Sequence, residues 1–111
     1  MEVRFIKKGE YQGSDMEIGR VYEVIGVEAD CYRILNDSNQ PLLYNPNQFE
    51  IVSSREPDFW VTEYGEDGER YSYPASWSHA GFFEDFHDNV SSVVNQFWSE
   101  YRQLYGVNKN V

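Results

Sequence analysis

The first half of the chain is a series of short segments that alternate apolar and polar residues and end in residues typical of turns. Alternation with a period of two predicts half-buried β-strands. Turn formers at 36–40 and an Asn-Pro-Asn-Gln stretch at 45–48 separate the later segments, and a polar stretch with three glycines at 9–20 indicates a long loop. The predicted strands are 2–7, 21–27, 31–35, 42–44 and 49–52.

The second half predicts a β-hairpin followed by a helix. Aromatic-rich segments at 59–64 and 69–73 flank Gly65-Glu66-Asp67-Gly68, whose glycines accept positive φ, so the hairpin spans 57–73. From 82 to 105, apolar residues recur every three or four positions, which is typical of an amphipathic helix. A continuous helix of this length measures about 36 Å, so a break near Asp88 is the alternative. We expect one α+β domain over 1–111, with the helix packed on the sheet.

The order of five short strands, a long first loop and a one-turn helix before the last strand resembles the SH3-like small barrel over residues 2–53. In this resemblance 9–20 is the RT loop, 28–30 the n-Src loop and 36–40 the distal loop. The stretch from Asn45 to Phe49 is similar to the Pro-Ser-Asn-Tyr turn of the family. The resemblance implies a five-stranded β-barrel.

The same resemblance implies a groove that binds a proline-rich peptide segment of a partner. The groove residues it implies here are Tyr11, Pro46 and Phe49. The chain departs from the family where a tryptophan opens strand three, because Cys31 or Tyr32 takes that place.

Charge is the strongest indication of the kind of partner. The formal net charge is -10, of which -3 falls in residues 1–55 (nine acids, six bases) and -7 in 56–111 (ten acids, three bases). Binding to nucleic acid phosphates or to an anionic membrane surface requires the opposite sign. The acidic surface therefore predicts either a basic protein partner or a solubilising role alone.

Aromatic residues reach 17% of the chain, more than a domain of this size buries easily. Exposed tyrosines and tryptophans beside carboxylates form a typical protein-binding surface, whereas partial burial with wet polar tips is the alternative. The candidate partner-binding residues are Glu63, Tyr64, Glu66, Asp67, Glu69, Tyr71, Tyr73 and Trp77.

Motifs for catalysis, phosphate binding and metal binding are missing from the pattern. The glycines form no phosphate-binding loop, the serines no nucleophile elbow, and the single Glu84-x-x-His87 pair is half of a di-metal site. We therefore expect no enzyme activity, no cofactor and no metal. Because Cys31 is the only cysteine, and because no membrane span or signal peptide is visible in the sequence, we expect a cytoplasmic protein.

These observations lead to two hypotheses for function. The first is a non-enzymatic binding protein whose acidic, aromatic surface docks on a basic partner, possible partners being a toxin or a nuclease. In size and charge the chain is similar to small acidic bacterial immunity proteins and phage-encoded inhibitors. The second hypothesis is an SH3-like adaptor module that binds a peptide. We expect a monomer or a weak homodimer.

Overall fold

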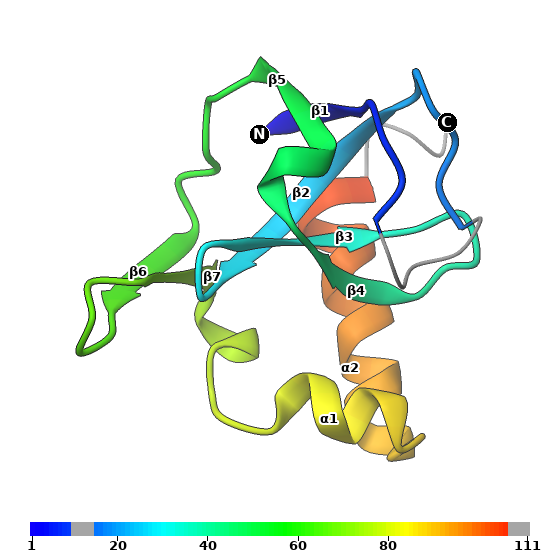
Figure 1. Cartoon of the computed structure of the whole chain (residues 1–111). Coiled ribbons are helices and arrows are strands. Elements are labelled where there is room, and N and C mark those ends of the chain that lie inside the picture. Colours follow the sequence, from blue (N-terminus) through cyan, green and yellow to red (C-terminus); the bar gives the residue numbers. More distant parts are fainter. Residues whose placement is uncertain (10–14, 107–111) are drawn as a thin grey trace. The chain divides into compact units, whose positions relative to one another are not determined.

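The computed structural model describes residues 1–9 and 15–106. It confirms the mixed α+β class: strands and helices both form, and the strands are antiparallel (Figure 1). The chain divides into two compact units, Met1–Ala75 and Ser76–Val111, and each is described by itself. That the two form one domain with the helix packed on the sheet stays a prediction.

The described part of the first unit contains seven strands, and each begins and ends within two residues of its prediction. A 3₁₀ turn, η1 (Pro46–Gln48), precedes the fifth strand. The strands are β1 (Glu2–Phe5), β2 (Val21–Glu28), β3 (Cys31–Leu35), β4 (Pro41–Tyr44), β5 (Phe49–Ser53), β6 (Trp60–Tyr64) and β7 (Arg70–Pro74).

The strands form one antiparallel sheet in the order β4-β3-β2-β1-β5, and the hairpin β6–β7 joins it through β7. The first half of β2 pairs with β1, and its second half pairs with β3 on one side and β7 on the other, so Val27 lies opposite both Tyr32 and Ser72. A register shift between Val24 and Gly26 lies between these two halves.

The sheet is open, so the expectation of a closed five-stranded barrel is wrong. Within the described residues, β4 and β5 end the path without pairing with each other. Because β2 is longer than β1, it has room for a second partner on the same side, and β7 takes that place. The hairpin therefore extends the sheet.

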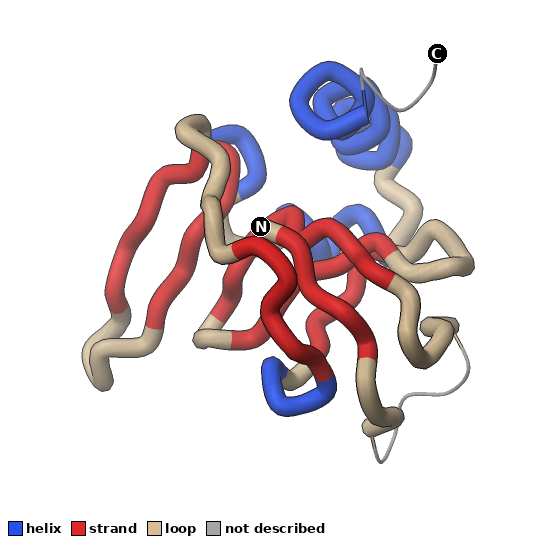
Figure 2. Tube along the Cα trace, turned by 90° about the horizontal axis from the view of Figure 1, so that it is seen from above, coloured by secondary structure: helices blue, strands red, loops and turns tan. Residues whose placement is uncertain are grey.

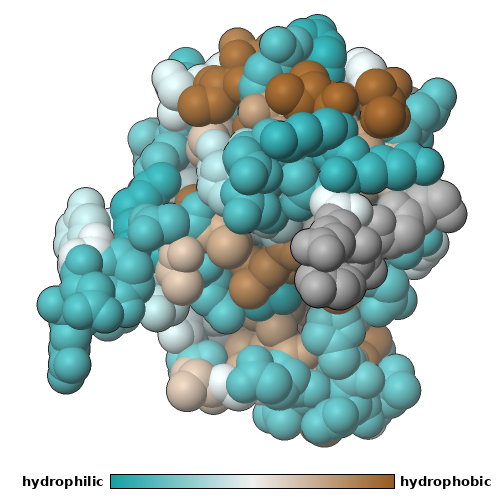
Figure 3. Space-filling view, viewed as in Figure 1, coloured by the Kyte–Doolittle hydropathy of each residue, from teal (hydrophilic) through white to brown (hydrophobic). Residues whose placement is uncertain are grey.

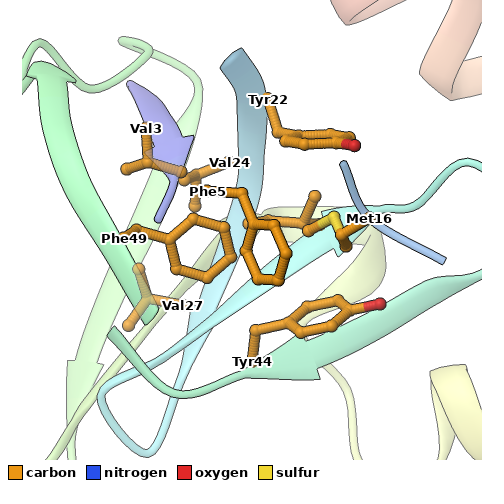
Figure 4. Packing of buried hydrophobic residues seen from close by; sticks show 9 residues of the cluster. Val3, Phe5, Met16, Tyr22, Val24, Val27, Tyr44 and Phe49 are labelled. Atoms are coloured by element: carbon orange, nitrogen blue, oxygen red, sulfur yellow. The ribbon is translucent and has the colours of Figure 1, made fainter. Parts of the chain in front are cut away.

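The core of this unit lies among the five first strands. Phe49 is near its centre: its ring centroid is 5.5 Å from that of Phe5, 5.8 Å from Tyr32 and 6.1 Å from Tyr44. Figure 4 shows Phe5, Tyr44 and Phe49 pointing toward one another from β1, β4 and β5. The buried cluster consists of Val3, Phe5, Met16, Tyr22, Val24, Val27, Ile34, Tyr44 and Phe49.

The described residues of the second unit contain two α-helices, so the single helix predicted over 82–105 is wrong and the alternative with a break is confirmed. The helix α1 (Phe82–His87) ends near Asn89, whose φ of 60° is left-handed, and α2 (Ser91–Tyr101) follows and continues into a π-helical segment, Arg102–Gly106. Asparagine adopts this conformation more readily than most residues. None of the helices in the described ranges is long and apolar enough to cross a membrane.

The core of the second unit is aromatic. Trp77 is 1% exposed, and its ring centroid lies 4.8 Å from that of Phe97. Its indole nitrogen donates to Glu100 at 2.9 Å, so the one polar atom of this side chain is satisfied. The buried aromatic residues are Trp77, Phe82, Phe83, Phe86, Phe97 and Tyr105.

Candidate functional site

The β6–β7 hairpin holds most of the predicted partner-binding residues. Its register places Glu63 opposite Tyr71 and Tyr64 opposite Arg70. Side chains of paired residues lie on the same face of an antiparallel pair and successive residues alternate. One face therefore has Val61 and Glu63 beside Tyr71 and Tyr73, and the other has Thr62 and Tyr64.

The turn of the hairpin is fixed by its two glycines and by Glu69. The amide of Gly68 donates to the carbonyl oxygen of Gly65 at 3.0 Å, and Gly68 has a φ of 80°, where a side chain is strained. The amide of Asp67 donates to the Glu69 carboxylate at 3.0 Å, and a Cβ at position 65 would collide with that carboxylate. Glu69 is thus part of the turn, which leaves it less free to meet a partner.

Exposure separates the predicted residues into two groups. Tyr64 is 70% exposed, and Glu63, Glu66 and Asp67 are exposed at and near the tip, where Figure 3 shows a mostly hydrophilic surface. Glu69 and Tyr71 are half-buried.

Tyr73 and Trp77 do not belong to this surface, and for these two residues the prediction needs correction. They are 4% and 1% exposed because their rings are taken up by packing. Trp77 packs in the second unit, whose aromatic core has been described. Tyr73 lies over Gly26, where even a Cβ would overlap its ring.

Tyr73 ends in a buried polar network that anchors the hairpin to the sheet. Its hydroxyl donates to Glu28 at 2.9 Å and accepts from Nε of Arg33 at 2.9 Å. The guanidinium of Arg33, a residue 5% exposed, also meets Glu28 at 2.9 Å and donates to the carbonyl oxygen of Pro41 at 2.9 Å. Burial raises the pKa of Tyr73 well above its ordinary value, so the hydroxyl stays protonated and can donate.

Sequence reasoning missed Glu28 and Arg33. A usable signal existed: Arg33 is the only charged residue in the segment from Cys31 to Leu35, which otherwise has the composition of a buried strand. A charge in such a segment indicates a buried partner.

The base nearest the acidic tip in sequence is already paired. Arg70 contacts Glu56 at 2.8 Å and donates to the hydroxyl of Ser72 at 3.0 Å. In the described part of the chain, Glu63, Glu66 and Asp67 form no ion pair. Their negative charge is therefore available to a partner.

Of the three groove residues that the SH3-like resemblance implies, one lies in the core. Phe49 is 8% exposed and packs in the core, which corrects its assignment to the groove. Pro46 is half-buried at the first position of η1, where Asn45 caps the turn by accepting from the amide of Asn47 at 3.0 Å. Tyr11 lies outside the described residues.

The described ranges contain no group of three or more His, Cys, Asp or Glu side chains that could hold a metal ion. Cys31 is a free, half-buried thiol at the start of β3. His79 and His87 are both exposed and each lies against a phenylalanine ring.

Comparison with known proteins gives no relative: no family model, no curated protein and no solved structure matches the chain. The β6–β7 hairpin and its exposed carboxylates are therefore the features that indicate a function.

Proposed function

We propose that the chain is a non-enzymatic binding protein that docks the β6–β7 hairpin on a basic protein partner and inhibits it. The supporting observation is the tip of the hairpin, where Glu63, Glu66 and Asp67 are exposed beside Tyr64 with no ion pair among the described residues. Carboxylates on such a surface pair with lysine and arginine, and tyrosine supplies contact area at low entropic cost.

Inhibition follows if the partner is a toxin or nuclease that uses its basic residues for phosphates. Carboxylates that pair with these residues block the same contacts. The small size and net charge of -10 fit an immunity-like inhibitor. We further propose that the chain acts in the cytoplasm, in line with the free thiol of Cys31, and that it is a monomer or a weak homodimer.

For the fold, we propose a relationship of residues 2–53 to the SH3-like small barrel. Support comes from the strand order β4-β3-β2-β1-β5, the long connection between β1 and β2, and the capped η1 turn directly before β5. The burial of Phe49 speaks against use of the groove of that family, so the adaptor hypothesis is the weaker one.

The experiment is affinity capture from the source cells with two charge-matched variants. The first reverses the tip (Glu63→Lys, Glu66→Lys, Asp67→Lys); Glu69 is left unchanged because it holds the turn. The control reverses three exposed acids elsewhere (Glu2→Lys, Glu17→Lys, Glu84→Lys), which gives the same net charge.

The tip variant is expected to lose a basic protein that the wild type retains, with affinity reduced about tenfold or more, slower association and weaker salt dependence. The control variant should keep that protein. If both variants lose the protein equally, net charge alone explains the binding. If the tip variant retains the protein, the hairpin is not the binding surface.

A further inference from the structure

The strand β6 is a free edge of the sheet. In the described chain it pairs with β7 alone, and β7 continues to β2 (Figure 2, where β6 is the outermost strand of the hairpin). Natural proteins usually protect such an edge with proline, lysine or a bulge. The segment from Trp60 to Tyr64 contains neither residue, and its register with β7 is continuous.

The register shows which backbone groups of β6 point outward. The amide of Gly65 donates to the carbonyl oxygen of Glu69 at 2.9 Å, so these two residues form a hydrogen-bonded pair. Hydrogen-bonded and non-hydrogen-bonded pairs alternate along an antiparallel ladder. The N–H and C=O groups of Thr62 and Tyr64 therefore face away from β7, toward the open side.

The side chains along this edge define the chemistry of an added strand. Val61, which is 47% exposed, and Glu63 lie on one face, and Thr62 and Tyr64 lie on the other. A neighbouring strand would meet an apolar position beside Val61 and a carboxylate beside Glu63. The exposed acids Glu66 and Asp67 continue the negative charge beyond the end of β6.

Charge decides between a second copy and a basic segment. Pairing β6 of two copies would bring their acidic hairpins side by side, which is unfavourable because like charges repel. Another edge of the sheet, β5, differs: Ile51 and Val52 are exposed there, Figure 3 shows hydrophobic surface over β1 and β5, and Glu50 is paired with Arg4 at 2.8 Å. Of these two edges, β6 has the exposed carboxylates without an ion pair among the described residues, and these charges favour a basic occupant.

We propose that the partner binds by strand addition: an extended segment of the partner pairs antiparallel with β6. Its backbone bonds to the outward N–H and C=O groups of Thr62 and Tyr64, a lysine or arginine lies opposite Glu63, and an apolar residue lies opposite Val61. Main-chain bonds supply affinity and alternate side chains supply specificity, as in other strand-addition complexes. This inference rests on the proposed function and adds how the basic partner is recognised.

The test uses the full chain and a short synthetic peptide, Thr-Lys-Thr-Val-Thr, whose lysine and valine lie two positions apart, so that in an antiparallel pair they face Glu63 and Val61. Titration followed by amide NMR should shift the Thr62 and Tyr64 signals and slow their hydrogen exchange. Thr62→Pro removes one outward N–H at a position where an edge strand tolerates proline. Thr62→Ala is the matched control, because it loses the contact of the Thr62 hydroxyl with Ser72 at 2.8 Å but keeps the N–H.

Peptide binding should weaken about fivefold or more in Thr62→Pro relative to Thr62→Ala, the effect of one lost main-chain hydrogen bond. As a second measurement on the wild type, a peptide N-methylated on the amides that face β6 should bind correspondingly less well than its unmethylated form. This comparison remains decisive if Thr62→Pro does not fold.

Equal binding of the methylated and unmethylated peptides overturns strand addition. If methylation has no effect but the tip variant with three lysines does not bind the peptide, the acidic hairpin is still the binding surface. Only strand addition as the mode of recognition is then wrong. If the tip variant binds the lysine peptide as well as the wild type does, the proposed function fails together with the inference.

Discussion

Tyr73, Arg33 and Glu28 form a buried polar network that joins the hairpin to the rest of the sheet. Each of the three side chains has a hydrogen-bond partner within the network: Glu28 accepts from both Arg33 and Tyr73, and Tyr73 accepts from Arg33. A buried polar group is costly only when it is left without a partner. Loss of one hydroxyl therefore affects two neighbours.

Tyr73→Phe is expected to lower the free energy of unfolding by about 1–3 kcal/mol at neutral pH, because Nε of Arg33 loses its acceptor while the ring remains in place. Urea unfolding followed by circular dichroism measures this. Tyr64→Phe, at an exposed position, serves as control and should change stability by less than about 0.5 kcal/mol. Equal stability of Tyr73→Phe and wild type would mean that the network contributes nothing.

The same residue gives the protein a pH dependence in the alkaline range. Folding raises the pKa of Tyr73 above its ordinary value of about 10, so the unfolded chain releases this proton first. The stabilisation is fully present below pH about 10 and is lost as the pH rises through the folded-state pKa. The stability difference between wild type and Tyr73→Phe should therefore narrow above pH about 10, and a constant difference would contradict this.

At the scale of elements, the break between α1 and α2 shows a helix start without a side-chain cap. Val90 is the N-cap of α2, and it makes no side-chain bond to the first turn. Valine is among the poorest residues at this position, whereas aspartate accepts from the free amides there.

Val90→Asp is expected to raise the stability of the second unit by about 0.5–2 kcal/mol, read as a higher Tm for the near-UV signal of its aromatic core. Val90→Ala is the control, since it removes the exposed valine without adding a cap. If the two variants unfold at the same temperature, the α2 start is already satisfied in another way.

The sequence predicts local elements well and their long-range partners poorly. The alternation of apolar and polar residues predicts both ends of β3, Cys31–Leu35, correctly. Gly65 and Gly68 predict the turn of the β6–β7 hairpin. No local sequence pattern predicts the pairing of β7 with β2. This pairing depends on Gly26, because its missing side chain leaves room for the Tyr73 ring. For the same reason Tyr73, aromatic and near acids, is predicted on the surface but lies buried.

At the scale of the whole molecule, each of the two units has its own cluster of buried side chains. The cluster around Phe49 is contained in residues 3–49, and that around Trp77 in residues 77–105. The hairpin belongs to the first unit through β7, so a cut after Ser53 removes Tyr73, one of the partners of Arg33, and leaves the second half of β2 without β7 beside it.

A fragment of residues 1–75 is therefore expected to keep well-dispersed amide signals, and a fragment of 1–53 is expected to aggregate or unfold. Heteronuclear NMR of both fragments at matched concentration is the measurement. A folded fragment 1–53 would show that the hairpin is an appendage, and an unfolded fragment 1–75 would show that the first unit needs the second.

The attachment of β7 to β2 also sets an order of events during folding. The hairpins β2–β3 and β6–β7 close over a few residues, on the scale of microseconds. Glu28 and Tyr73 are 45 residues apart, so their contact must wait for a much longer loop to close. On a ribosome-bound chain the β2–β3 hairpin can thus form early, whereas the β6–β7 hairpin and its docking on β2 must both wait until β7 has left the exit tunnel.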